Sequence, residues 1–105
     1  ALLPYPKSLN GGRYVTSDTG MRRFDSLAVE DCGNVCVATL FTGGITVASP
    51  DGGTAEFVET GDGYTTNICF GGENLQKAYI TLSWQGLLVE CDWPRPGLAL
   101  NFLNK

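Results

Sequence analysis

The sequence contains no histidine, and its four cysteines include no Cys-x-x-Cys pair. Structural zinc sites need such ligands at close spacing, so the sequence argues against one. We therefore expect Cys32, Cys36, Cys69 and Cys91 to be reduced and mostly buried, as small apolar residues of a cytosolic protein. A disulfide framework is the alternative, although the apolar strands of the chain do not require it.

Positive charge is scarce, with seven Lys and Arg against eleven Asp and Glu, and only Arg22 and Arg23 are adjacent. Phosphate binding needs a clustered basic face, so nucleic acid is not an expected partner. Apolar runs stay well short of the roughly 18 residues that span a membrane, so no membrane association is expected. No signal peptide is visible and we expect a cytoplasmic protein, although a chain that begins at Ala1 can be processed or truncated.

Glycine, in contrast, is plentiful at 14 residues, and turn sequences divide the chain into short β-favouring runs. The pattern predicts an all-β fold of antiparallel strands. One set of four strands is expected at 27–30, 35–40, 45–49 and 55–59, and a second set of three at 67–70, 77–83 and 87–92. The two prolines of the segment 93–97 end the second set, because proline cannot donate to a strand ladder.

The second set repeats the plan of the first. Leu27 matches Ile68 at a spacing of 41 residues, and Val37 matches Ile80 at 43 because the second turn is longer. Self-similarity at this period with short strands is typical of propeller blades. Two blades cannot close a ring and would leave broad apolar flanks, so a stable monomer is not expected.

We divide the chain into a lead-in at 1–12 and a propeller segment at 13–105, with the first blade at about 25–60 and the second at about 66–103. The β-favouring run at 13–16 has no obvious local partner. It can supply the missing fourth strand of a neighbour's second blade. The apolar tail at 98–103 is expected to pack on the sheets or to pair as an edge strand.

Three stretches carry a family resemblance: FDSLAVEDCGNVCVAT at 24–39, TTNICFGGENLQKAYITLS at 65–83 and LLVECDWPRPGLALNF at 87–102. In them the chain resembles the SMP-30/gluconolactonase/luciferin-regenerating-enzyme-like family from about residue 13 to the end. The resemblance implies a six-bladed β-propeller, of which this chain looks like the last third. The expected fold is therefore two four-stranded antiparallel blades that need neighbours to close.

The resemblance also implies a metal-dependent hydrolase of the lactonase type, acting on a small-molecule lactone. Members hold a divalent cation, calcium or zinc, through a Glu, an Asn and an Asp from different blades. Asp25, which begins the Asp25-Ser26 motif, matches the Asp that binds the metal and acts as general base. The Glu and Asn ligands lie in blades that this chain does not contain. A hard cation polarises a lactone carbonyl, while a carboxylate beside it accepts a proton.

Asn67 and Ser26 are the candidate substrate-binding residues. Asn67 takes the equivalent place in the second blade and can offer an amide oxygen to a metal or substrate. The alternatives stay open: Asp25 as a turn acid ahead of its strand, and Asn67 as a residue that bonds its own backbone. The aromatic residues of the second set are expected to pack between blades rather than to form a substrate platform; they are Phe70, Tyr79, Trp84 and Trp93.

These patterns favour three hypotheses. The chain is a lactonase-type hydrolase whose other blades lie on a second chain or on a lost part of its own. Alternatively, three copies close a six-bladed ring and bring three Asp25 side chains to one axis. In the third, the chain is a non-catalytic binding or structural module that kept the blades and lost the site.

Overall fold

The computed structural model describes residues 23–52 and 55–100. Its elements, in chain order, are β1 (Arg23–Val29), β2 (Val35–Leu40), β3 (Gly44–Ala48), β4 (Ala55–Glu59), β5 (Thr65–Gly71), the short 3-10 helix η1 (Glu73–Leu75), β6 (Lys77–Leu82) and β7 (Leu87–Asp92). The expected all-β fold is confirmed. Within the described ranges, no helix has the length and apolar character needed to cross a membrane.

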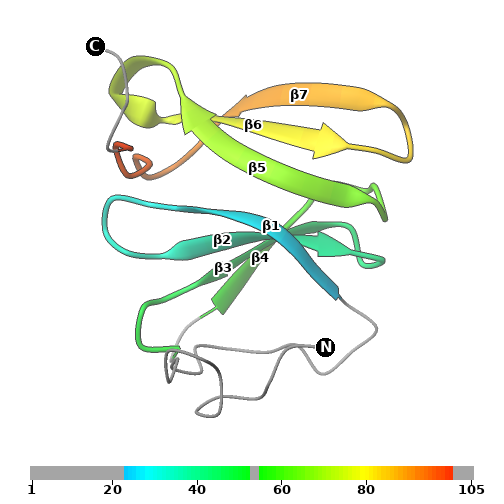
Figure 1. The fold of residues 1–105 in the computed structure, drawn as a ribbon, viewed down its shortest axis with the longest axis horizontal. Helices are drawn as coiled ribbons and strands as arrows, with labels where there is room; N and C mark the ends of the chain where they lie inside the picture. The colour runs from blue at the N-terminus through cyan, green and yellow to red at the C-terminus, as the bar shows by residue number, and fades with distance from the viewer. Residues whose placement is uncertain (1–22, 53–54, 101–105) are drawn as a thin grey trace.

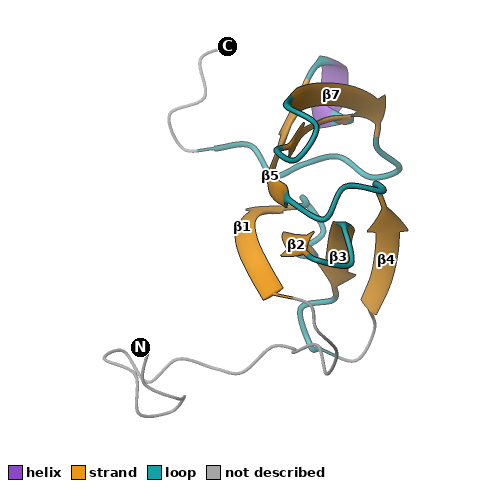
Figure 2. Cartoon of the chain, turned by 90° about the vertical axis from the view of Figure 1, so that its right-hand side faces the viewer, coloured by secondary structure: helices purple, strands orange, loops and turns teal. Residues whose placement is uncertain are grey.

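The strands form two antiparallel sheets, one of four strands in the order β1-β2-β3-β4 and one of three in the order β5-β6-β7. Figure 1 shows one sheet stacked on the other, and Figure 2 shows β5 crossing above β1 and β2. The second sheet has three strands in the described part of the chain, as its predicted set has, and the fourth strand expected for a full blade would have to come from elsewhere. The run at 13–16, proposed as a strand, lies outside the described residues.

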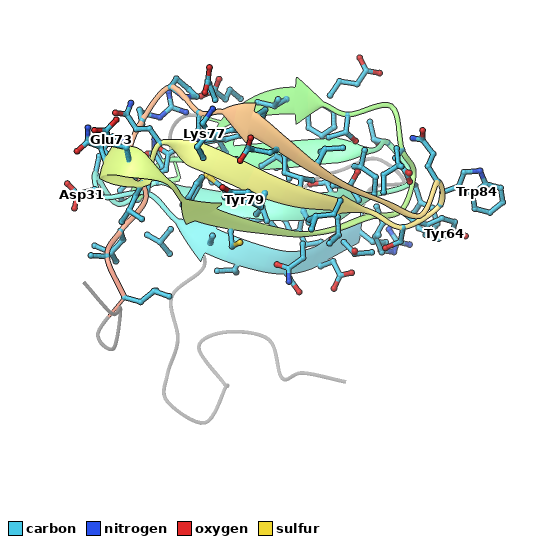
Figure 3. The ribbon with its side chains drawn as sticks, turned by 90° about the horizontal axis from the view of Figure 1, so that it is seen from above. Asp31, Tyr64, Glu73, Lys77, Tyr79 and Trp84 are labelled. Atoms are coloured by element: carbon cyan, nitrogen blue, oxygen red, sulfur yellow. The ribbon has the colours of Figure 1, made fainter. Side chains whose placement is uncertain are left out.

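The outward face of the second sheet is largely polar. Lys77 and Tyr79 alternate with buried Ala78 along β6 and lie on this face in Figure 3. Lys77 donates to Asp92 of β7 over 2.7 Å. The broad apolar flank expected on this side is not found on β6, because alternation along this strand gives its apolar residues to the other sheet, whereas Leu87 and Leu88 of β7 are exposed.

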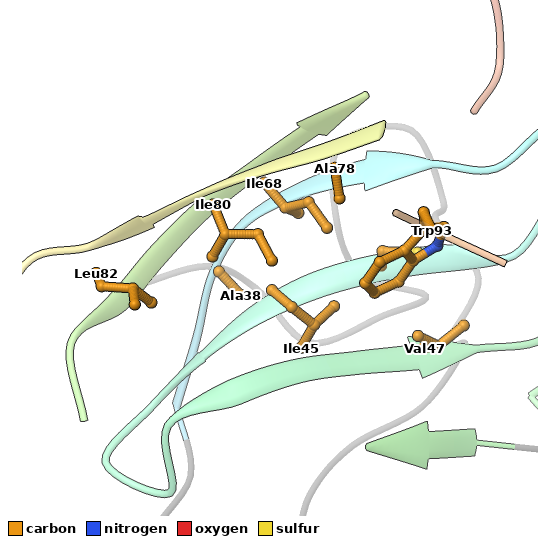
Figure 4. Close-up of a cluster of buried hydrophobic side chains, with 9 residues drawn as sticks. Ala38, Ile45, Val47, Ile68, Ala78, Ile80, Leu82 and Trp93 are labelled. Carbon is orange, nitrogen blue, oxygen red and sulfur yellow. The ribbon is translucent and has the colours of Figure 1, made fainter. Parts of the chain in front are cut away.

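The core lies between the two sheets (Figure 4). Its buried residues are Cys36, Ala38, Ile45 and Val47 from the first sheet and Ile68, Ala78, Ile80, Leu82 and Trp93 from the second sheet and the segment after it. Trp93 closes one end of the core and lies 5.9 Å from the ring of Phe70, measured between centroids. The expectation that Phe70 and Trp93 pack between the sheets is confirmed.

After β7 the chain returns to the first sheet. The backbone N–H of Asp31 donates to the carbonyl of Pro96 over 2.9 Å, and that of Leu98 donates to the carbonyl of Val29 over 2.9 Å. Gly97 forms an isolated bridge with Glu30, and a β-carbon at Gly97 would lie 2.5 Å from that of Phe70. The described start of the tail therefore pairs beside β1, and close packing there needs glycine.

Candidate functional site

The first strand of each sheet, β1 or β5, lies at one edge of the sheet, and the two strands contact each other. We call them the inner strands, and both carry β-bulges at equivalent positions. In β1, Phe24 pairs with Thr39 and Leu27 with Val37, so Asp25 and Ser26 stand opposite one residue. In β5 the register shifts between Thr65 and Asn67. A bulge turns a side chain out of the regular ladder and is common beside functional sites. The two sheets therefore share this bulge as well as the pattern of strands that the sequence repeats.

Asp25 lies inside β1, not ahead of the strand as expected, because β1 begins at Arg23. The bulge accounts for the difference: it interrupts the alternation that marks a strand in the sequence. Asp25 and Ser26 are both exposed. The residues that carry this carboxylate and this hydroxyl are thus adjacent in the sequence, on the inner strand β1 of the first sheet.

Asn67 is exposed on β5, and its side-chain oxygen accepts the backbone N–H of Ile68 over 2.8 Å. This is the backbone-bonding alternative considered for this residue. An oxygen engaged in that way has less capacity for a metal or a substrate.

An apolar cavity of about 420 Å³ lies beside Asn67. It is lined by Leu27, Ala28 and Val29 of β1, by Asn67, Ile68, Cys69 and Phe70 of β5, and by Leu98 and Leu100 of the tail. The two inner strands, which lie side by side in Figure 1, form its walls. Asp25 and Ser26 are not among its lining residues, so the structure brings Asn67 but not these two residues into this hollow.

A cation site of the kind the family resemblance implies needs several oxygen ligands directed at one point. Among residues 23–52 and 55–100, no three Cys, Asp or Glu side chains converge in a way that could hold a metal ion. Asp25 alone does not make such a site, and the oxygen of Asn67 is engaged. The described residues do not fit a resident metal on their own.

The carboxylate of Glu30 is the charged group most deeply enclosed by the fold, with a side-chain exposure of 0 %. It accepts hydrogen bonds from Trp93 Nε1 at 2.7 Å and from Arg95 Nε at 2.6 Å. Asn34 Nδ2 adds a bond at 3.0 Å and Cys36 Sγ one at 3.3 Å. Side chains from both halves of the chain therefore surround one buried charge.

Burial alone would raise the pKa of Glu30, but the hydrogen bonds from Arg95 and Trp93 outweigh it and lower the pKa to about 2. The guanidinium of Arg95 also bonds Glu56 of β4 over 2.8 Å. A carboxylate that is ionised and fully bonded is a poor proton acceptor. The Glu30 cluster thus joins the sheets rather than performing acid–base chemistry.

Asp62, in the loop between the sheets, is the second enclosed carboxylate, and it is buried. Burial raises its pKa, but bonds from the backbone of Tyr64 and from Gln85 and Trp84 lower it further than burial raises it. Neither Asp62 nor Glu30 was singled out from the sequence. Local patterns do not reveal them, because the donors from Trp84 and Gln85 lie 22 and 23 residues from Asp62.

Cysteine burial departs from expectation. Cys36 is buried, whereas Cys32, Cys69 and Cys91 are exposed. Cys69 neighbours buried Ile68 on β5 and so points to the opposite, outward face. Burial and the negative charge of Glu30 raise the pKa of the Cys36 thiol.

Two other aromatic residues, Tyr79 and Trp84, do not pack between the two described sheets. Tyr79 is on the outward face of the second sheet, and Trp84 stands at one end of the molecule in Figure 3. At the other end lie the turn acids Asp31 and Glu73. Both acids are exposed, Asp31 in the turn after β1 and Glu73 at the start of η1.

Two stacked antiparallel sheets, with matching bulges on their inner strands, are the arrangement of neighbouring blades in a propeller-type protein. A family model described as the SMP-30/Gluconolactonase/LRE-like region matches residues 6–83. The match covers most of the chain, and the chain belongs to this family. It includes both bulges, Glu30 and Asp62, and ends before Trp93 and Arg95. No curated protein was found to match the chain.

Proposed function

We propose that the chain is a two-blade part of a lactonase-type hydrolase, in which Asp25 contributes to the hydrolytic site. The observation that supports this role is the position of Asp25. It is an exposed carboxylate on the bulge of an innermost strand, inside the segment that matches the lactonase-like family. Inner strands of propeller blades surround the central channel, where a small lactone would bind.

The proposed reaction needs one proton acceptor at the attacking water. The Asp25 carboxylate takes a proton from water as the water oxygen bonds to the lactone carbonyl carbon. The ring C–O bond then breaks, and the leaving alkoxide takes the proton from Asp25, which restores the carboxylate and leaves an open hydroxy acid. In this proposal the hydroxyl of Ser26, next to Asp25 in the sequence, hydrogen-bonds the substrate.

The divalent cation, calcium or zinc, remains a proposal that needs ligands from other blades. For that reason we propose that hydrolysis occurs only in a complete six-bladed propeller. The outer edge of β7 has no strand partner in the described part of the chain, which supports a contact with a further strand. The other blades would come from a second chain or from copies of this one, and three two-blade copies would make six blades.

A second candidate function is a non-catalytic structural or binding module that assembles with itself. The engaged oxygen of Asn67, and the lack of a converging acidic group among the described residues, favour it. We place either form in the cytoplasm, since the exposed thiols of Cys32, Cys69 and Cys91 suit a reducing compartment.

Proton release during ring opening of glucono-δ-lactone distinguishes the two functions, after subtraction of the spontaneous rate. Wild type, Asp25→Asn and Asp31→Asn are compared with added calcium, zinc or manganese. Asp31 is the matched control, because it is also an exposed Asp but lies in the turn between β1 and β2 and not on the bulge. Loss of a general base should lower the rate at least about 100-fold in Asp25→Asn, and Asp31→Asn should match wild type. Background rates under every metal for wild type that has assembled to the mass of a complete propeller would instead support the structural module.

A further inference from the structure

Three exposed aromatic side chains, Phe41, Tyr64 and Trp84, lie together where β1 and β5 begin; we call them the aromatic platform. The rings of Tyr64 and Trp84 stack, with centroids 5.6 Å apart and planes inclined by 27°. Phe41 meets Tyr64 edge-on at 6.5 Å. Figure 3 shows Trp84 projecting from this end with Tyr64 beside it, and the side chain of Trp84 is 75 % exposed.

Asp62 joins two of the loops that carry the platform, at 60–64 and 83–86, and the Phe41 N–H joins the third by donating to the carbonyl of Gly63 over 2.7 Å. Asp62 Oδ1 accepts the backbone N–H groups of Tyr64 at 2.8 Å and Trp84 at 3.3 Å. Its Oδ2 accepts the backbone and side-chain N–H groups of Gln85 at 3.0 and 3.2 Å. Ser83 further donates its N–H to the carbonyl of Tyr64 over 2.9 Å. The backbone is thus ordered before any ligand arrives, so binding there costs little further ordering.

The three loops that carry the platform are polar and almost uncharged, and the nearest basic residue on the neighbouring strand is Arg23, which pairs with Leu40 ahead of Phe41. In the three loops, at 41–43, 60–64 and 83–86, the one charged residue is Asp62, and both of its oxygens are engaged by N–H donors. The other polar side chains are hydroxyls and an amide, from Thr42, Thr60, Ser83 and Gln85. A nucleic acid or an acidic ligand needs basic groups, which these loops lack.

Aromatic rings flanked by hydroxyl and amide groups match the chemistry of a neutral sugar. The C–H bonds on one face of a pyranose ring carry partial positive charge and meet the negative face of an indole. The hydroxyls at the edge of the sugar ring would share hydrogen bonds with these neutral polar side chains, which bond within the fold through Gln85 Nε2 to Asp62 and through Thr60 Oγ1 to Thr65 Oγ1. We propose that the aromatic platform binds a neutral saccharide by stacking a sugar ring on Trp84.

The platform lies at the same end of the strands as the β1 bulge. Leu40, which precedes Phe41, pairs with Arg23 at the start of β1. Asp25 follows two residues later, roughly 7 Å along the strand. The platform is nevertheless a separate binding site, and its existence does not depend on the proposed hydrolysis.

The test is a ¹H–¹⁵N NMR titration of the protein with three neutral oligosaccharides, namely cellohexaose, maltohexaose and mannohexaose. The chain has two tryptophans, so its two indole N–H signals report separately on exposed Trp84 and buried Trp93. At least one oligosaccharide should shift the Trp84 signal and leave that of Trp93 unchanged. Trp84→Ala should weaken this binding at least about tenfold, as expected for removal of a stacking anchor.

Leu100→Ala is the matched control, since Leu100 is a similarly exposed apolar side chain of the tail, which bonds through Leu98 to Val29 at the other end of β1 from the platform. It should bind as wild type does. The remaining Trp93 signal shows that Trp84→Ala is still folded. The proposal is overturned if none of the three sugars shifts the Trp84 signal at a sugar concentration of about 10 mM. A dissociation constant above this value corresponds to less than about 3 kcal/mol of binding free energy. A Trp84 signal that moves with protein concentration alone would also overturn it, because the platform would then be a contact between copies.

Discussion

Trp93, which follows the last strand of the second sheet, donates its indole N–H over 2.7 Å to the carboxylate of Glu30, at the end of the inner strand of the first sheet. The two residues are 63 positions apart in the sequence. A buried charge is tolerated only while its partners hold it. The contact therefore favours one arrangement of the two sheets, the arrangement that places the two bulged strands side by side.

Removal of this charge should destabilise the protein strongly. In Glu30→Gln, an amide N–H₂ replaces one carboxylate oxygen among N–H donors and leaves Arg95 without its buried partner. We expect the free energy of unfolding to fall by about 3–5 kcal/mol, measured by urea denaturation. Glu56→Gln removes the exposed partner of the same arginine and should cost less than about 1 kcal/mol. Equal costs for the two variants would contradict the assigned role of Glu30.

The stability of the protein should also depend on pH through Glu30. Its pKa of about 2 in the folded protein lies below its value in the unfolded chain, near 4.3. The unfolded chain therefore binds more protons between these values, and stability falls as the pH is lowered from about 4.5 to about 2. The loss amounts to at most roughly 3 kcal/mol. Urea midpoints across this range should fall more steeply for wild type than for Glu30→Gln, whereas parallel slopes would show that other groups are responsible.

Two glycines with the same backbone conformation allow a test of packing in the loops that carry the platform. Gly43 and Gly61 both have φ of +80°, but a β-carbon at Gly43 would lie 2.6 Å from the carbonyl oxygen of Asp62, and one at Gly61 meets nothing within 4 Å. Gly61→Ala should cost about 1 kcal/mol from the left-handed backbone alone. Gly43→Ala should cost a further 1–3 kcal/mol or so in urea denaturation, from the added overlap. Identical midpoints for the two variants would refute this packing.

Cysteine reactivity should follow burial. Three thiols, those of Cys32, Cys69 and Cys91, are exposed, whereas Cys36 is buried. Burial and the charge of Glu30 raise the pKa of Cys36, and partial burial beside Asp92 raises the pKa of Cys91, whose thiol stays accessible to a reagent. Because the thiolate is the reactive form, a disulfide reagent such as DTNB should titrate three thiols in the native protein and the fourth only on unfolding. Cys36→Ser should remove the slow thiol and keep the three fast ones. Four fast-reacting thiols in the native wild type would show that Cys36 is not buried.

The regular part of the fold could be predicted from the sequence, because strands and turns leave local signals. Alternation and the turn residues indicated the seven strands of the two sheets, and the spacing from Leu27 to Ile68 indicated that one sheet repeats the other. The start of β1 could not be predicted. A bulge places Asp25 and Ser26 opposite one residue of β2 and thereby breaks the alternation that would mark them as strand residues.

The contacts between the sheets could not be predicted either. Nothing near Glu30 in the sequence shows that its partners, Trp93 and Arg95, arrive 63 and 65 residues later. Trp84 resembled a core residue by its type alone, but it follows the last residue pair of β6 and so lies in a turn. For Trp84, the position in the hairpin of β6 and β7 gave more information about burial than the type of side chain.

The most direct test of the proposed function is the lactone ring-opening rate of each fraction from gel filtration, with the native mass measured by light scattering. If the chain contributes Asp25 to a propeller completed by other blades, activity should elute with a species larger than the monomer, at about three chains for the trimer. The same species formed by Asp25→Asn should be inactive. Activity at the mass of one chain, or undiminished activity in Asp25→Asn, would contradict the account.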